Sequence, residues 1–221
     1  MVKQLKPIKV YGTGGPNPPK VAMILEELGI PYDAEAVMLK DIKQPEYLAI
    51  NPNGRIPSIH DPNTDITLWE SGAIIEYLIE RYDKEHKLSF EPGTAEAYHA
   101  KQWLFFQATG QAPYYGQYAW FRRYAPEEIP LALERYAKEA NRVTAVLEGH
   151  LSKQKDGEEW LVGGKCSYAD IAFVSWQVGF GMMAKKEEFD ADKYPHVKAW
   201  LARMLERKGT KKGYETKGML H

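Results

Sequence analysis

The sequence predicts an α/β domain followed by an all-helical domain, and two observations carry this prediction. From the start of the chain to Asp83, short β-branched or aromatic runs alternate with runs of helical periodicity. Beyond Asp83 the strand signals nearly vanish, and apolar residues recur at helical spacing. The predicted boundaries are residues 1–86 for the α/β domain, 87–93 for a linker and 94–221 for the helical domain.

In the first domain the predicted order is strand, helix, strand, short helix, two strands and a helix, which makes a small mixed sheet with helices packed on it. Strands are expected at residues 8–11, 32–39, 55–61 and 66–70, the last two joined as a hairpin. The first helix ends at Gly29, and its apolar residues recur at i, i+3, i+4 and i+7: Val21, Ile24, Leu25 and Leu28.

In the second domain, helices are expected at residues 95–109, 132–151, 168–180 and 197–205. The helix at 168–180 is apolar almost all round, so we expect it to be buried at the centre of the domain. Ser167 and Asp170 open it with a variant of the capping box, which predicts a role in folding rather than in chemistry. The last stretch, KGTKKGYETKGMLH, is expected to be a polar tail.

Composition and charge exclude several classes of function. The formal net charge is −1, so there is no basic excess to favour nucleic acid or anionic membranes. A single cysteine, Cys166, excludes an internal disulfide and a cysteine-rich metal site, and the six histidines lack the spacing of metal ligands. The start MVKQLKPIKV has no apolar core of secretory length, and no run approaches the roughly 20 apolar residues that span a bilayer. We therefore expect a protein of the reducing cytoplasm.

Several fragments in order carry a resemblance over essentially the whole chain. They are PNPPKVAMILEELG at 16–29, PEYLAINPNGRIPSI at 45–59, LWESGAIIEYL at 68–78, WLFFQ at 103–107, ALERY at 132–136 and SYADIA at 167–172. The chain resembles the soluble glutathione transferases, and within them the group of the yeast prion-forming nitrogen regulator and the bacterial nu class. The resemblance implies a thioredoxin-like first domain, glutathione as co-substrate, no metal, and a homodimer.

The first candidate residue is Asn17, in the loop GTGGPNPPK. Before Pro18 and Pro19, an asparagine is a good helix N-cap. The resemblance implies instead that its side-chain amide donates to the glutathione sulfur and favours the thiolate, which is the reactive form of a thiol. Gly15 stands where bacterial relatives have a hydroxyl residue, and Thr13 is the alternative donor.

Two further segments are expected to bind glutathione. Pro57 is compatible with a plain edge strand, but the resemblance implies a cis Ile56–Pro57 bond that turns the backbone of Ile56 toward the cysteinyl part of the ligand. Ser71 alone is explained as a helix N-cap. In the family context Glu70 pairs with the glutamyl ammonium, and Ser71 with the adjoining carboxylate at a helix start.

Three basic residues are further candidates for binding glutathione. Arg55 and Lys43 are solvated charges on their own, and the resemblance implies that they hold the glycyl carboxylate. Arg135 matches an arginine that reaches the site from the helical domain, and an ion pair with Glu139 at i+4 explains it equally well.

The aromatic run YYGQYAWFRRY is the densest in the chain. A core or dimer contact accounts for it, because aromatic residues are enriched in both places. The alternative is an apolar wall for the second, electrophilic substrate, with Tyr114, Tyr118 and Trp120 as its residues. The resulting hypothesis is a glutathione transferase that conjugates electrophiles or reduces disulfides or peroxides. The alternative is a non-enzymatic glutathione-binding module that interacts with other proteins.

Overall fold

The computed structural model describes residues 5–12, 14–155 and 159–215. These residues form two compact units. The first unit contains the described residues up to Ser89 together with those from Glu206 onward, and the second contains the described residues of Phe90–Leu205.

The first unit is built on a mixed sheet with strand order β2-β1-β3-β4. Its strands are β1 (Ile8–Tyr11), β2 (Tyr32–Glu35), β3 (Ser58–Asp61) and β4 (Ile66–Trp69). β1 and β2 pair in parallel, whereas β1 with β3 and β3 with β4 pair antiparallel. The predicted order of strands and helices is confirmed. The second strand is shorter than expected because β1 ends at Tyr11, opposite Glu35, so the chain beyond Glu35 has no ladder partner in that strand.

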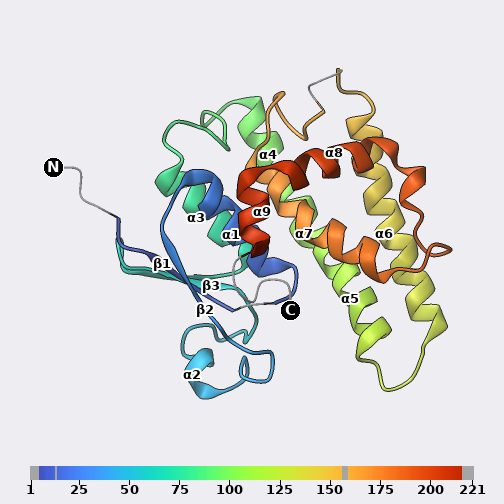
Figure 1. The fold of residues 1–221 in the computed structure, drawn as a ribbon, viewed down its shortest axis with the longest axis horizontal. Coiled ribbons are helices and arrows are strands. Elements are labelled where there is room, and N and C mark those ends of the chain that lie inside the picture. The colour runs from blue at the N-terminus through green and yellow to red at the C-terminus, as the bar shows by residue number, and fades with distance from the viewer. Residues whose placement is uncertain (1–4, 13, 156–158, 216–221) are drawn as a thin grey trace. The chain divides into compact units, whose positions relative to one another are not determined.

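Helices complete the first unit: α1 (Asn17–Leu28), α2 (Pro45–Leu48), α3 (Ser71–Tyr82) and α9 (Lys208–Glu215). Figure 1 shows α1 and α3 over one face of the sheet and α2 beyond the other face. Between sheet and helices lies a fully buried apolar core that includes Val10, Val21, Ile59, Ile74 and Leu78. As predicted, α1 ends at Gly29, which adopts the left-handed conformation with φ +67°.

The polar stretch near the end of the chain differs from expectation, because residues 208–215 form the helix α9 and pack on α1 (Figure 1). Two glycines four residues apart allow this. A Cβ at Gly209 would lie 2.5 Å from Cγ of Glu27, and one at Gly213 would lie 2.6 Å from Cγ of Met23. α9 therefore runs antiparallel to α1 and belongs to the first unit, whereas the sequence places all of residues 94–221 in the second.

An ion pair fixes the start of α9. Arg207 donates to both carboxylate oxygens of Glu27, from Nε at 3.0 Å and from a terminal nitrogen at 2.7 Å. Glu27 is only 8% exposed, so this bidentate pair is largely shielded from solvent. The contact anchors the chain at the point where it rejoins the first unit.

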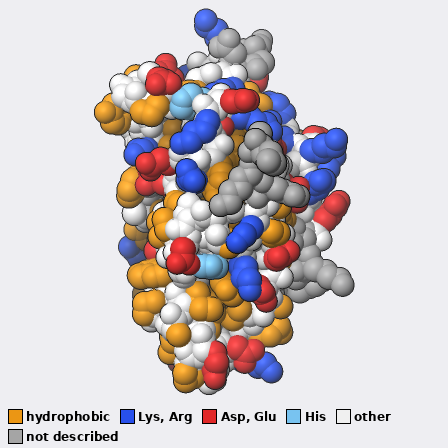
Figure 2. Space-filling view, turned by 90° about the vertical axis from the view of Figure 1, so that its left-hand side faces the viewer, with side chains coloured by type: hydrophobic (Ala, Val, Ile, Leu, Met, Phe, Trp, Pro, Cys, Tyr) orange, Lys and Arg blue, Asp and Glu red, His pale blue; other side chains and the backbone are white. Residues whose placement is uncertain are grey.

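The second unit is helical. It contains α4 (Ala95–Phe106), a π-helical turn (Gln107–Gln111), α5 (Ala112–Arg123), α6 (Pro130–Leu151), α7 (Tyr168–Met183), a 3-10 turn (Ala191–Lys193) and α8 (Pro195–Glu206), whose last residue falls in the first unit. The prediction that α7 is buried is confirmed, since Ile171, Phe173 and Val174 are fully inaccessible. Among the described residues, no helix combines the length and the apolarity needed to cross a bilayer. On the face shown in Figure 2, acidic and basic side chains are interspersed.

The predicted capping box at the start of α7 is also confirmed. The Asp170 carboxylate accepts hydrogen bonds from the Ser167 amide at 2.9 Å, the Leu161 amide at 3.0 Å and the indole N–H of Trp200 at 2.9 Å. Complete burial raises the pKa of Asp170, and these hydrogen bonds oppose that effect. Asp170 therefore connects α7 with α8 and with the loop before α7, which agrees with the predicted role in folding.

Candidate functional site

The register of the sheet brings three loops of the first unit together at one edge. Tyr11 in β1 pairs with Ser58 in β3, and Ser58 pairs in turn with Trp69 in β4. Three residues extend this row past the last pairs: Gly12, Pro57 and Glu70. They begin the loop before α1, end the loop before β3 and precede α3, respectively. The strand register therefore brings two of the candidate segments, Ile56–Pro57 and Glu70–Ser71, to the edge where the loop before α1 also begins.

The peptide bond between Ile56 and Pro57 is cis, which confirms the expectation. Pro57 is buried and Ile56 is half-buried. The side chain of Ile56 lies against Gly12, where a Cβ would collide with it, and Gly12 has φ +99°. This position requires a glycine both for its backbone conformation and for the close approach. The loop that leads to α1 is consequently in contact with the residue before the cis-proline.

Asn51 and Tyr47 shape the loop around Arg55, and the sequence did not point to either of them. The buried Asn51 side chain donates to the Arg55 carbonyl at 2.6 Å and accepts from the Asn53 amide at 2.9 Å. The Tyr47 hydroxyl donates to the same carbonyl at 2.8 Å and lies 2.9 Å from Oγ of Ser58. The motif NPNG carries a signal for this turn, because asparagine side chains commonly bond to the backbone two residues on. The Arg55 backbone is thus held in place while its side chain stays exposed.

Glu70 occupies an unusual backbone position. It is exposed and has φ +70° and ψ 112°, and Asn53 donates to its Oε1 at 3.3 Å. α3 begins at Ser71 and has no side-chain cap, so the simple capping explanation of Ser71 does not hold. The first N–H groups of a helix lack intrahelical partners and carry partial positive charge. An acidic residue and an anion-attracting helix start therefore lie side by side.

Asn17 is the first residue of α1 and is half-buried. The cap position is occupied by Pro16, with no side-chain hydrogen bond to cap the helix. The capping interpretation of Asn17 is therefore wrong, and the functional interpretation stays a prediction. Gly14 and Gly15 both have positive φ in the loop before it. Thr13 lies outside the described residues.

The basic candidates are found in different surroundings. Lys43 is exposed, and its ammonium donates to the Asn53 carbonyl at 2.9 Å, so it adjoins the loop that carries Arg55. Arg135 is exposed on α6 in the second unit. Glu139, the i+4 partner considered for Arg135, forms its ion pair with Arg142 at 2.8 Å.

Lys20 is a further residue that sequence reasoning missed. It lies in the first turns of α1 and is only 1% exposed. Burial lowers its pKa to about 7, although the negative charge of Glu70 acts to raise it. The sequence signal is a single charged residue directly before the apolar positions of a buried helix.

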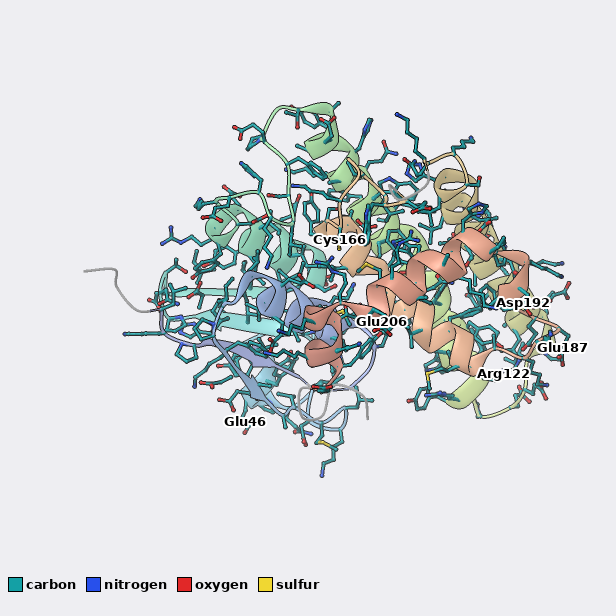
Figure 3. The ribbon with its side chains drawn as sticks, turned by 45° about the horizontal axis from the view of Figure 1, so that its top comes forward. Glu46, Arg122, Cys166, Glu187, Asp192 and Glu206 are labelled. Atoms are coloured by element: carbon teal, nitrogen blue, oxygen red, sulfur yellow. The ribbon has the colours of Figure 1, made fainter. Side chains whose placement is uncertain are left out.

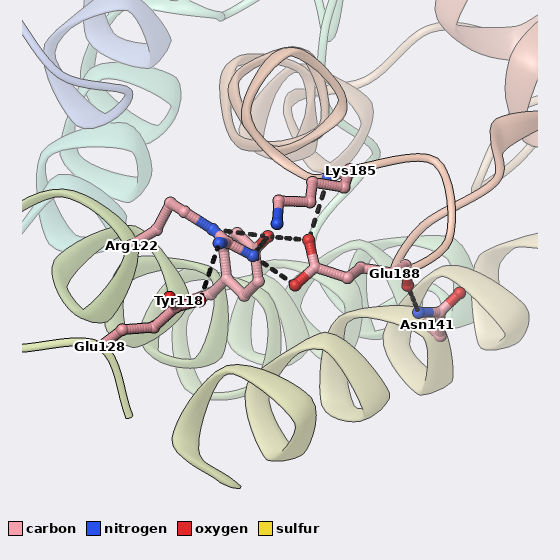
Figure 4. Close-up of polar contacts among 6 residues, drawn as sticks. All are labelled: Tyr118, Arg122, Glu128, Asn141, Lys185 and Glu188. Carbon is pink, nitrogen blue, oxygen red and sulfur yellow. Dashed lines mark hydrogen bonds and ion pairs between the residues drawn. The ribbon is translucent and has the colours of Figure 1, made fainter. Parts of the chain in front are cut away.

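The aromatic residues of α5 differ from one another. Tyr118 is fully buried, its ring packs on Phe180 at 4.9 Å, and its hydroxyl donates to Glu188 at 2.7 Å (Figure 4). Burial and the bond to Glu188 raise the pKa of Tyr118 to about 12. These contacts favour the core interpretation of Tyr118. Tyr114 is half-buried and Trp120 is 46% exposed, so both retain surface for a ligand.

Arg122 completes this polar cluster. Its guanidinium donates to the Tyr118 hydroxyl at 3.0 Å and forms an ion pair with Glu188. Figure 4 shows Glu188 between the helix that carries Arg122 and the chain at Lys185, whose amide donates to Glu188 at 3.0 Å. The charged groups of this cluster satisfy one another, which is typical of a structural network.

Cys166 lies directly before α7, inside the second unit (Figure 3). It is buried, and its sulfur is 3.7 Å from that of Met204. In the part of the chain that the structure describes, no three His, Cys, Asp or Glu side chains gather as a possible metal site. The sheet edge offers helix starts, the Glu70 carboxylate and the cations Lys43 and Arg55, which are groups able to bind a small charged ligand.

The chain matches two family profiles. One is described as "Glutathione S-transferase, N-terminal domain" and covers residues 15–81, and the other as "Glutathione S-transferase, C-terminal domain" and covers residues 112–208. The Glutathione S-transferase-like protein gedE of Aspergillus terreus is 58% identical over 96% of each chain. Glutathione S-transferase 1 of Schizosaccharomyces pombe is 39% identical over 91% of this chain and 92% of its own. The transcriptional regulator URE2 of Saccharomyces cerevisiae is 33% identical over 87% of this chain and 63% of its own.

Solved structures show the same fold. Glutathione transferase URE2P6 of Phanerochaete chrysosporium, in complex with oxidized glutathione, is 46% identical with a TM-score of 0.88, over 95% of this chain and 96% of its own. A glutathione transferase homolog from Lodderomyces elongisporus, with two GSH per subunit, is 36% identical with a TM-score of 0.90, over 96% of this chain and 100% of its own. Ure2p5 of P. chrysosporium, cocrystallized with 1-(S-glutathionyl)-2,4-dinitrobenzene, is 39% identical with a TM-score of 0.86, over 97% of this chain and 96% of its own. The predicted thioredoxin-like first part and helical second part are confirmed.

Proposed function

Because the chain belongs to the glutathione S-transferase family, we propose that it is a glutathione transferase whose ligand binds at the sheet edge of the first unit. The observation that carries the proposal is the row formed by Gly12, Pro57 and Glu70, because α3 begins directly after Glu70 and the loop that follows Gly12 leads to α1. Two helix starts and the exposed acidic residue Glu70 suit a small peptide with an ammonium, two carboxylates and a thiol.

Each part of glutathione has a partner in this proposal. The backbone of Ile56, next to the cis bond to Pro57, pairs with the cysteinyl residue. Glu70 receives the glutamyl ammonium, and the start of α3 at Ser71 receives the adjoining carboxylate. The cations that receive the glycyl carboxylate in this proposal are Arg55 and Lys43. Arg135, on the second unit, stays a predicted glutathione-binding residue.

Asn17 acts on the sulfur in this mechanism. Its amide donates a hydrogen bond to the thiolate, which lowers the pKa of the bound thiol from its ordinary value of about 8.5. The thiol proton leaves to solvent, the thiolate attacks an electrophilic carbon, and the carbon–sulfur bond forms as the leaving group departs with its electron pair. The chain contributes deprotonation and positioning, without a covalent enzyme intermediate. Tyr114 and Trp120 of α5 are proposed as apolar walls for the electrophile.

Reduction of a glutathione disulfide is a second candidate reaction. It is favoured by the relative URE2P6, which was crystallised with oxidized glutathione. Bound glutathione thiolate attacks one sulfur of a mixed disulfide, the S–S bond breaks, and the released thiolate takes up a proton. Both reactions use the same activated sulfur, so the same site serves either.

A non-enzymatic binding module is the alternative from a different class. It is favoured by the 33% identity to URE2, which is named a transcriptional regulator. In that case glutathione binds without turnover and the protein acts through partners.

We further propose a homodimer in the cytoplasm, and exposed apolar side chains support a self-contact: Ile66, Trp69, Tyr98 and Phe105.

The test combines binding with turnover on one purified sample. Titration calorimetry with reduced glutathione measures binding, and 1-chloro-2,4-dinitrobenzene and a small glutathione mixed disulfide measure the two reactions. We expect binding together with at least one activity. Binding without either activity supports the module, and no heat with either reduced or oxidised glutathione contradicts the proposed function. Sedimentation showing only monomer at micromolar concentration contradicts the dimer.

A further inference from the structure

The backbone carbonyl of Arg55 accepts two side-chain hydrogen bonds in the loop before β3. The Tyr47 hydroxyl donates to it at 2.8 Å, and the side-chain amide of Asn51 donates to it at 2.6 Å. Both donors are nearly inaccessible to solvent, since Tyr47 is 5% and Asn51 1% exposed. The direction of this carbonyl is therefore fixed, because turning it outward would break both bonds.

The two donors are themselves held in place. The Ser58 hydroxyl lies 2.9 Å from that of Tyr47, and because the single Tyr47 proton goes to Arg55, Ser58 is the donor in this bond. Oδ1 of Asn51 accepts from the Asn53 amide at 2.9 Å. Burial raises the pKa of Tyr47, which keeps its hydroxyl protonated and able to donate at neutral pH. The contacts on the Arg55 carbonyl are thus formed without a ligand.

The turn before Arg55 is closed by its own contacts. The Gly54 amide donates to the Asn51 carbonyl at 2.9 Å. Gly54 has φ +57°, and a Cβ there would lie 2.6 Å from the carbonyl oxygen of Ile42, so glycine is required for both reasons. Loss of one side-chain bond to Arg55 should therefore act on the peptide unit after Arg55 and leave the rest of the turn in place.

The fixed carbonyl also sets the direction of the next amide. The peptide bond between Arg55 and Ile56 is trans, and in a planar trans unit the C=O and the N–H point in opposite directions. Because the carbonyl points at Tyr47 and Asn51, the Ile56 N–H points away from them. Within the described ranges of the chain, this N–H donates no hydrogen bond.

We infer that Tyr47 and Asn51 are positioning residues, which hold the Arg55 carbonyl inward so that the Ile56 N–H can donate to the cysteinyl residue of glutathione. This inference rests on the proposed function above, in which the backbone of Ile56 pairs with that residue. Neither side chain touches the ligand in this role, because both act through one peptide unit. Holding that unit before binding removes the cost of ordering it during binding.

The first experiment measures affinity. Calorimetry titrates reduced glutathione into the wild type, Tyr47→Phe and Asn51→Asp. Tyr47→Phe removes one of the two donors, and we expect it to weaken glutathione about three- to tenfold, as for the loss of one hydrogen bond. Asn51→Asp keeps an acceptor for the Asn53 amide but replaces the donor to Arg55 by a second acceptor. It should weaken glutathione by about tenfold or more.

Tyr77→Phe is the matched control. Tyr77 lies in the same unit, and its hydroxyl also makes two hydrogen bonds, to Asp61 at the other end of β3 at 2.7 Å and to Thr64 at 2.6 Å. Its loss should cost stability as the loss of the Tyr47 hydroxyl does, but glutathione affinity should stay within about twofold of the wild type.

Hydrogen exchange of the Ile56 amide, followed by NMR, is a readout that a merely structural role would not move. In the free wild type this amide should exchange rapidly, and saturating glutathione should slow it by about tenfold or more. In Tyr47→Phe saturated with glutathione the slowing should be smaller, because the peptide unit turns away for part of the time. Tyr77→Phe should match the wild type.

Three results overturn the inference: wild-type glutathione affinity in Tyr47→Phe, equal weakening in Tyr47→Phe and Tyr77→Phe, or an Ile56 amide whose exchange glutathione does not slow in the wild type. The last measurement needs no variant, so it decides the question even if a substituted chain does not fold. If calorimetry detects no glutathione binding to the wild type, the proposed function fails instead. The two failures are therefore distinguishable.

Discussion

Lys20 and Asn17 both lie in the first turns of α1. We expect substitution of Lys20 to change the stability of the fold and substitution of Asn17 to change activity. The pKa of Lys20 is about 7 in the folded chain, below the value of about 10.4 for an unfolded lysine. Between these values the unfolded chain binds more protons, so stability rises with pH. The cost of burying Lys20 is fully present below pH 7 and is lost as the pH rises through 10.4.

Lys20→Met removes this cost and keeps a side chain of similar length. We expect the variant to be more stable than the wild type at pH 7, by roughly 1–4 kcal/mol, as for other buried charges replaced by apolar residues. The advantage should shrink at pH 10. Urea unfolding at both pH values, with Lys9→Met as the exposed control, measures it. A variant less stable than the wild type at pH 7 would show that the ammonium supports the fold.

For Asn17→Ala the expected effect is on activity. Asn17 is the first residue of α1 and not its N-cap, so the variant should lose less than about 0.5 kcal/mol of stability, compared with about 1 kcal/mol for a true cap. Loss of a hydrogen bond to a thiolate should lower kcat/KM for conjugation about 10- to 100-fold. Thermal unfolding and steady-state kinetics on the same preparation test both parts. Normal activity with lowered stability would reject the role in thiol activation.

At the scale of elements, α9 packs closely on α1 in the first unit. A Cβ at Gly213 would lie 2.6 Å from Met23 Cγ and 3.0 Å from its backbone nitrogen, so the backbone of α1 would have to shift. Gly213→Ala should destabilise the chain by roughly 1–3 kcal/mol, although alanine is the better helix former.

A second helical glycine serves as a control, and its substitution should change stability in the opposite direction. Gly149 lies in α6, and a Cβ added there would meet no other described atom within 4 Å, so Gly149→Ala should stabilise the chain by up to about 1 kcal/mol. Chemical unfolding of both variants provides the comparison. If the two substitutions have the same effect, the close approach of α9 to α1 is not a feature of the folded chain.

The elements also show what the sequence can predict. Strand and helix patterns identified β1, the β3–β4 hairpin, α1, α3 and α7, because each has a clear apolar period or turn chemistry. α9 was missed because KGTKKGYE has few apolar residues, and its packing depends on glycines that let two backbones meet. Lys20 was missed because burial is a property of the assembled core. The roles of Tyr47 and Asn51 depend on bonds to a loop carbonyl, which no periodicity reveals.

For the whole molecule, ligand binding should act mainly on the first unit. A ligand present at 100 times its Kd adds about 2.7 kcal/mol to the stability of the state that binds it. Hydrogen exchange with saturating glutathione should therefore slow most in the loops around Gly12, Ile56 and Glu70. Protection confined to the described residues of Phe90–Leu205 would contradict a site at the sheet edge.

The return of the chain to the first unit has a consequence for synthesis on the ribosome. The sheet, α1 and α3 are translated first, but α9, which covers Met23 and Glu27 on α1, follows the whole second unit. A nascent chain that has emerged only as far as Ser89 leaves that side of α1 open to water. The first unit therefore completes its packing after the second, and chaperones would meet this open surface until α9 has emerged.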